Sequence, residues 1–64
     1  MSLPRMTLYY VYYHGSWMDE GQEEMQRVYA MNEQSAQQQF KEQFVRFIPG
    51  KPTVTILRIE EQVK

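Results

Sequence analysis

One cluster of side chains in this chain has the residue types that metal binding or acid–base catalysis would use. His14 is followed closely by four carboxylates, those of Asp19, Glu20, Glu23 and Glu24. A structural or catalytic metal site would need further histidine or cysteine ligands at a fixed spacing, and the chain has one histidine and no cysteine. We therefore expect this segment to be a solvated loop that binds no metal and no cofactor.

Other motifs that carry chemistry do not occur in the sequence. No serine or threonine lies in a motif that would activate it as a nucleophile, and no glycine-rich loop precedes a helix. A chain of 64 residues also has little material with which to enclose a catalytic pocket. We expect neither enzymatic activity nor a small-molecule substrate.

Length and charge narrow the classes of protein further. A chain this short buries only about 60% of its unfolded surface, so it forms a single domain. Seven basic and eight acidic residues give a net charge of −1, which disfavours a strongly basic nucleic-acid binder and an acidic DNA mimic. No apolar run reaches the roughly 18 residues that a membrane span needs. We expect a cytoplasmic protein with a disordered arm over residues 1–5 and one folded domain over residues 6–62.

The elements that position these residues begin with a strand rich in tyrosine. Residues 6–13 contain four of the five tyrosines and no charge. Aromatic and β-branched side chains on both alternating faces are typical of a central strand, which we predict over residues 6–14. Alternation puts Tyr9, Val11 and Tyr13 on one face and Leu8, Tyr10 and Tyr12 on the other. The pattern leaves open which face meets the rest of the domain.

Two further strands are predicted from residue type and alternation. Residues 23–31 alternate with a period of two, and the small side chains of Val28 and Ala30 suit an inner face on which a helix can lie close. Residues 53–60 consist almost entirely of good strand formers. Between the first two strands, the sequence predicts a loop whose Trp17 folds back over the edge of the sheet.

A helix is predicted between the second and third strands. Asn32 is a typical N-cap residue, and Glu33 places negative charge in the first turn. The apolar residues then recur at steps of four, four and three, which forms one stripe: Ala36, Phe40, Phe44 and Phe47. Pro49 and Gly50 end the helix, because proline disfavours helical geometry at the residue before it.

These elements predict the fold class and its topology. The first two strands are joined by a short link and should be antiparallel, and the crossover through the helix should be right-handed. If the third strand pairs with the free side of the first, every neighbouring pair is antiparallel. The expected fold is α+β, with a three-stranded antiparallel sheet in the order second, first, third and one helix on one face.

A segment of the chain resembles two known families. Residues 28–36 read V-Y-A-M-N-E-Q-S-A, a strand ending in V-x-A followed by N-E-x-x-A at the start of a helix. This turn resembles that of the archaeal large-subunit ribosomal protein LX family. That family is similar also in its Val-containing first strand, in the Gly and Trp of the following loop, and in a late strand matched by Leu57, Arg58 and Ile59. The small DpnD/PcfM-like proteins of mobile elements share the same turn.

The resemblance implies a strand–strand–helix–strand fold with Val28, Ala30 and Ala36 inside. It does not imply binding to ribosomal RNA, because the ribosomal family is markedly basic around its last strand. Here Arg58 is the only basic residue between Lys51 and Lys64. Short length, a nearly neutral charge and the lack of enzyme motifs look like an accessory protein of a phage or prophage.

The predicted fold leaves a surface available for binding. One helix covers only one face of a three-stranded sheet, so the other face meets water or a partner. Tyrosine, methionine and arginine are enriched at protein interfaces. The candidate interaction residues are the strand tyrosines, the loop tryptophan and the outward residues of the second strand: Tyr9, Tyr10, Tyr12, Tyr13, Trp17, Arg27, Tyr29 and Met31. We expect a protein-interaction module that forms a homodimer through this face or an edge strand and offers its remaining surface to another protein.

Three alternatives remain open at this point. The exposed tyrosines and Arg27 could bind single-stranded nucleic acid by stacking and phosphate contact, although the neighbouring acids disfavour nucleic acid as a partner. A partner could instead bind the acidic loop at residues 19–24. Finally, the tyrosines could be only half exposed, with the loop that carries Trp17 covering them.

Overall fold

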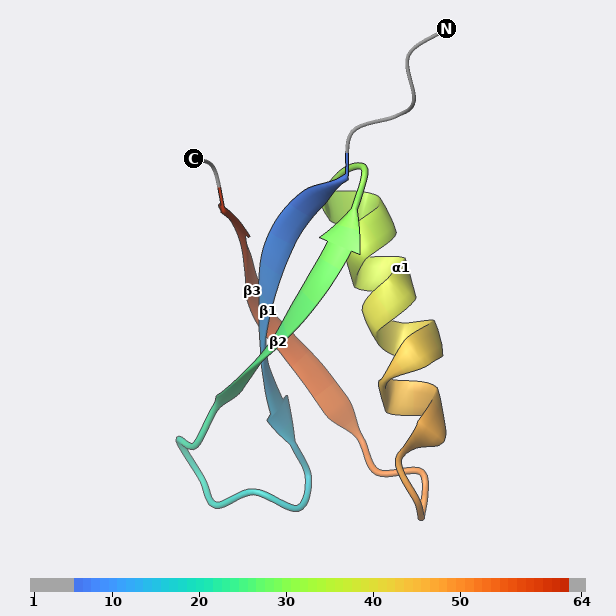
Figure 1. Ribbon diagram of the computed structural model, residues 1–64. Coiled ribbons are helices and arrows are strands. Elements are labelled where there is room, and N and C mark those ends of the chain that lie inside the picture. Colours follow the sequence, from blue (N-terminus) through green and yellow to red (C-terminus); the bar gives the residue numbers. More distant parts are fainter. Residues whose placement is uncertain (1–5, 63–64) are drawn as a thin grey trace, which may run out of the picture.

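The computed structural model describes residues 6–62, so the arm predicted over residues 1–5 lies outside the described part. The elements are β1 (Thr7–Gly15), β2 (Glu24–Ala30), α1 (Glu33–Gln43), the short 3₁₀ helix η1 (Val45–Phe47) and β3 (Val54–Gln62). Figure 1 shows one helix lying along one side of a twisted sheet. The predicted α+β class and the order strand, strand, helix, strand are confirmed.

The sheet has the predicted topology. Its strand order is β2-β1-β3, and both neighbouring pairs are antiparallel. The tyrosine-rich strand β1 is therefore central, and Tyr10 lies between Arg27 of β2 and Glu60 of β3. The strand ends differ from the predicted ones by one or two residues, as expected where backbone pairing rather than residue type sets the boundary.

The core lies between α1 and one face of the sheet. It consists of Tyr9, Val11, Tyr13, Val28, Ala30, Ala36 and Phe40. The Tyr13 ring lies 5.2 Å, centroid to centroid, from both the Phe40 and the Phe44 rings. These contacts answer the question that alternation left open, because they turn Tyr9, Val11 and Tyr13 toward the helix and leave Tyr10 and Tyr12 on the other face.

The helix begins as predicted and ends earlier. The Asn32 side-chain Oδ1 accepts a hydrogen bond from the Ser35 backbone N–H at 2.8 Å, which caps the first turn. The α-helix stops at Gln43, and a 3₁₀ turn follows. Phe44 lies between the two helices with φ −116° and ψ −61°, which departs from α-helical geometry, so the periodicity of α1 does not extend to Phe47. The predicted stripe is wrong at Phe47, which is 73% exposed.

An irregularity in β3 changes which of its side chains face outward. Tyr12 pairs with Arg58, but Tyr13 pairs with Ile56, so Leu57 is an extra residue on β3. Such a β-bulge bends and twists the strand. Because Ile56 and Ile59 both pack against the core, Leu57 and Arg58 lie consecutively between two inward residues.

Candidate functional site

The side of the sheet away from α1 forms the candidate interaction surface, which we call the open face. Alternation and strand register place these residues on it: Leu8, Tyr10, Tyr12 and His14 of β1, Met25, Arg27 and Tyr29 of β2, and Arg58, Glu60 and Gln62 of β3. The residues of β1 are half-buried, whereas Tyr29 is 61% exposed. The most accessible aromatic side chain of the open face is therefore on the edge strand β2.

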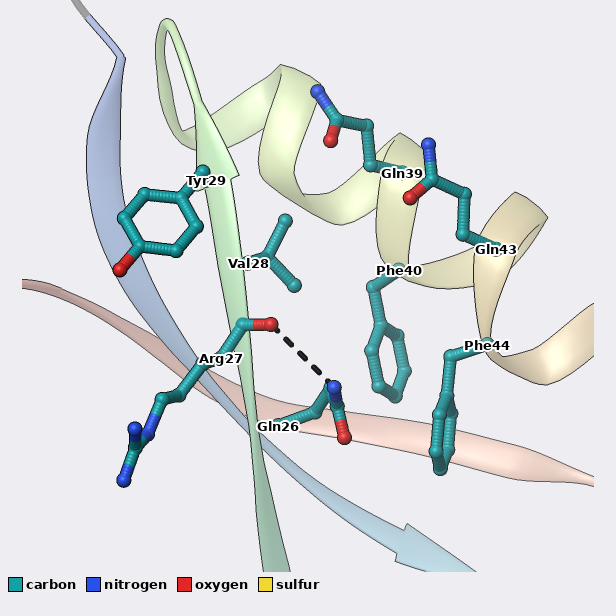
Figure 2. Close-up of a pocket in the computed structure, with 8 residues that line it drawn as sticks. All are labelled: Gln26, Arg27, Val28, Tyr29, Gln39, Phe40, Gln43 and Phe44. Atoms are coloured by element: carbon teal, nitrogen blue, oxygen red, sulfur yellow. Dashed lines mark hydrogen bonds between the residues drawn. The ribbon is translucent and has the colours of Figure 1, made fainter.

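On β2, the outward side chains point directly away from the helix. Figure 2 shows Tyr29 and Arg27 on one side of the strand and Val28 on the side of α1. Met31, just after the strand, is 55% exposed. The loop that joins β1 to β2 lies at the other end of β2, so it does not cover Tyr29 or Met31. The sequence prediction of exposed residues at Arg27, Tyr29 and Met31 thus agrees with their positions.

Arg58 of β3 lies on the open face at the edge opposite β2, and two carboxylates neutralise its charge. Its guanidinium carbon lies 3.9 Å from the centre of the Tyr12 ring, a cation–π contact. The same guanidinium forms ion pairs with Glu60 at 3.1 Å and with Glu23 at 3.3 Å. Hydrogen bonding to Glu60 and Glu23 raises the pKa of Arg58. This cation is engaged by two carboxylates and is poorly placed to meet a phosphate.

Tyr9 and Tyr13 belong to the core and not to the open face. Each is only 4% exposed. The Tyr9 hydroxyl donates a hydrogen bond to Glu61 Oε1 at 3.2 Å, and the Tyr13 hydroxyl donates one to Glu24 Oε2 at 3.5 Å. Burial is the main reason that the pKa of both phenols is raised, and the neighbouring carboxylates add to the effect. Tyr9 and Tyr13 are therefore core residues whose hydroxyls reach the edge of the core.

Trp17 lies in the loop after β1 and remains half exposed. The exposed fraction of Trp17 is 51%, and its ring packs on the backbone of Gly15, where an added Cβ would overlap the indole. The Gly15 N–H also donates to the Met18 sulfur at 3.3 Å. Trp17 therefore packs on the end of β1, far from Tyr29 and Met31.

The acidic loop shows no arrangement suited to metal binding. The His14 imidazole lies 2.6 Å, through Nδ1, from the Gln22 carbonyl oxygen, which links the end of β1 to the loop. Within residues 6–62, no three histidine or carboxylate side chains come together in a way that could hold a metal ion. The ring is held by the loop backbone instead.

A groove of about 310 Å³ runs between the outer edge of β2 and α1. Its lining combines apolar Val28, Phe40 and Phe44 with the amides of Gln26, Gln39 and Gln43. Figure 2 shows the Gln39 and Gln43 side chains on α1 above the two phenylalanine rings. The Gln26 side-chain Nε2 donates to the Arg27 carbonyl oxygen at 3.5 Å. The groove thus places uncharged hydrogen-bonding groups beside a strand edge.

Two features of this surface were not among the sequence-predicted site residues. Met25 continues the row of Arg27 and Tyr29 on β2, and Leu57 is exposed through the bulge in β3. A signal for the bulge exists in the sequence, because Ile56 and Ile59 are three residues apart in a strand whose side chains should alternate with a period of two.

Comparisons of the chain with protein-family models, curated proteins and solved structures give no match. In the part of the chain that the structure describes, no helix has the length and apolar character of a membrane span.

Proposed function

We propose that this chain is a small non-enzymatic protein-interaction module that forms a homodimer. The observation that carries the proposal is a row of exposed interface-type residues, with α1 packed on the opposite side of the sheet. The row consists of Met25, Arg27 and Tyr29 on β2 and Met31 just after it. Tyrosine, methionine and arginine provide large contact areas and retain polar groups for the rim of an interface.

The size of the core supports a need for association. Within residues 6–62, seven buried residues form the core, and the chain has no cysteine for a disulfide. Small domains without disulfides or metals commonly gain stability from oligomerisation. Burying Tyr29 and its neighbours against a second copy would add apolar contact without any change to the fold.

The strand order supports association as well. In the described sheet, β2 and β3 each pair with β1 on one side only. Unpaired N–H and C=O groups along a strand edge are a template for pairing with another chain. The open face and the strand edges adjoin one another, so a single partner can use both.

Binding of single-stranded nucleic acid is the less favoured alternative. Stacking would be possible on Tyr10, Tyr12 and Tyr29, but a phosphate backbone also requires positive charge. Arg58 is already paired with Glu23 and Glu60, so Arg27 is left as the main cation of the open face in the described part of the chain. The charge pattern therefore favours protein over nucleic acid as the partner.

Sedimentation equilibrium across a wide range of protein concentrations tests the proposal. We expect the average mass to rise from 7.8 kDa toward twice that value as concentration increases. Tyr29→Ser should weaken the association, whereas Gln37→Ser on the exposed side of α1 is a matched control that should not. A monomer at every concentration would rule out the homodimer. Oligonucleotide binding that weakens with added salt would favour the alternative instead.

A further inference from the structure

The edge of β2 is open to a second strand, and the orientation of its backbone can be deduced. Ser16, just after β1, donates its N–H to the carbonyl oxygen of Thr53, just before β3, at 2.9 Å, so the even-numbered residues of β1 direct their backbone groups toward β3 and the odd-numbered ones toward β2. The odd-numbered Val11 and Tyr9 pair with Gln26 and Val28, whose backbone groups therefore face β1. In an antiparallel ladder the backbone groups of alternate residues point to the same edge. The N–H and C=O groups of Met25, Arg27 and Tyr29 therefore face outward, while those of Gln26 and Val28 face β1.

We propose that a second copy of this chain adds to this edge, antiparallel, about a two-fold axis at Val28. The inference rests on the proposed homodimer and names the surface that forms it. In this register, Arg27 lies opposite the partner's Tyr29, and Tyr29 lies opposite the partner's Arg27. Both are pairs whose backbone groups face outward, so each pair exchanges two N–H···O bonds. Two three-stranded sheets become one six-stranded sheet.

The sequence of β2 is self-complementary in this register. A guanidinium next to a tyrosine ring is favourable as a cation–π contact, the same pairing that Arg58 and Tyr12 make within the chain. Met25 lies opposite the partner's Met31, which covers two further exposed side chains. On the helix side, Val28 faces its own copy. The exposed residues of β2 thus find partners among themselves.

Other registers of the same strand are less favourable. An axis at Arg27 would put each guanidinium opposite its own copy, and like charges directly opposite destabilise a strand pair. An axis at Gln26 would place Glu24 opposite the partner's Val28 and Tyr29 opposite the partner's Glu23, so Arg27 and Tyr29 would not meet. An axis at Tyr29 would shorten the overlap, because β2 ends at Ala30. The axis at Val28 combines a long overlap of the two strands with a favourable cation–π pair between Arg27 and the partner's Tyr29.

The groove beside β2 fits a second copy for a separate reason. In a continuous sheet the two α1 helices lie on the same face, so the two grooves join across the axis. Gln26, Gln39 and Gln43 line each groove. A side-chain amide is uncharged and is both donor and acceptor, so it can hydrogen-bond to an identical amide. Lysine or glutamate at these positions would repel its own copy.

The other edge of the sheet carries features that oppose strand addition. The bulge at Leu57 interrupts β3, and Arg58, Glu60 and Glu61 place charge along it. Bulges and charged residues are the means by which natural edge strands avoid pairing. The short strand β2 has one charged residue, Arg27, between Glu24 and its end. The β2 edge is therefore better suited to strand addition than the β3 edge.

A charge exchange across the axis tests the surface and the register together. In Arg27→Glu, a carboxylate replaces the cation opposite the partner's Tyr29, and in Tyr29→Lys, two cations face each other. We expect each single substitution to weaken dimerisation about tenfold or more. The double variant Arg27→Glu/Tyr29→Lys places a carboxylate opposite an ammonium group at both pairs and should recover most of the affinity. Far-ultraviolet circular dichroism checks that each exposed-site variant keeps its fold.

A mixed sample of isotope-labelled and unlabelled protein gives a second measurement. Intermolecular NOEs between the Tyr29 ring and the Arg27 side chain are expected from this register. If the wild type dimerises but the single variants bind as tightly as it does, and the NOEs involve β3 or the central tyrosines, then the β2 interface is wrong and the homodimer stands. A wild type that stays monomeric overturns the homodimer itself.

Discussion

At the scale of single residues, Tyr9 and Tyr13 show why a run of tyrosines can form a central strand. Their rings fill the core against α1, and their hydroxyls reach carboxylates at its rim, on Glu61 and Glu24. A tyrosine combines a large apolar ring with one polar group that needs a partner when buried. The same residue type can therefore serve the core on one face of β1 and the half-exposed surface on the other.

The two buried phenols predict a loss of stability at alkaline pH. Burial raises the pKa of Tyr9 and Tyr13 above the ordinary value of 10.0. Below pH 10 the hydroxyls are protonated in the folded and unfolded states alike, so their contribution is complete. Above it the unfolded chain loses these protons first, and the free energy of unfolding falls. Urea unfolding at a series of pH values measures this slope, and a slope that persists in the double variant Tyr9→Phe/Tyr13→Phe would contradict the explanation.

At the scale of elements, local breaks decide where side chains point. The change from α1 to a 3₁₀ turn exposes Phe47, and the bulge in β3 exposes Leu57. The start of α1 is defined just as locally, since the Asn32 side chain satisfies a free N–H of the first turn. The helix is regular only between its cap and its 3₁₀ end, and β3 only on either side of its bulge. These breaks determine which side chains are exposed.

The N-cap can be tested directly. Asn32→Ala removes the acceptor of the Ser35 N–H, and we expect the free energy of unfolding to fall by about 1 kcal/mol. Asn32→Asp and Asn32→Ser keep an oxygen in the same place and should retain most of that stability. Urea denaturation of the four proteins gives the comparison. Equal stability of Asn32→Ala and the wild type would mean that the cap contributes nothing measurable.

The cap at Asn32 and the faces of β2 could be predicted because each follows from a local pattern, and the strand order follows from general rules on how strands are connected. Val28 and Ala30 are small and alternate with exposed side chains, so period two alone placed them correctly inside. The inner face of β1 could not be predicted, because both its faces are aromatic and the choice depends on contact with Phe40 and Phe44. Those contacts join residues far apart in the chain, which no local pattern contains.

At the scale of the whole molecule, the fold over residues 6–62 has two layers, a three-stranded sheet and one helix that covers a single face of it. α1 lies along one face of the sheet (Figure 1), and in the described part of the chain β2 is paired with β1 on one side only. A chain of this length buries too little surface to gain much stability from its own core. Association through β2 would extend the sheet and the helix layer together, so folding and binding should be coupled.

That coupling predicts a melting temperature that depends on protein concentration. Because only the folded chain can dimerise, mass action stabilises it by roughly 2.7 kcal/mol per dimer for a ~100-fold increase in concentration. For a domain of this size, about 1 kcal/mol shifts the midpoint by roughly 4–8 °C, so a rise of several degrees is expected. Calorimetry on the wild type and on Arg27→Glu separates the effect from monomer stability, since the variant should melt at a nearly constant temperature until higher concentrations. A wild-type midpoint that does not move over this range would show that the domain folds without its partner copy.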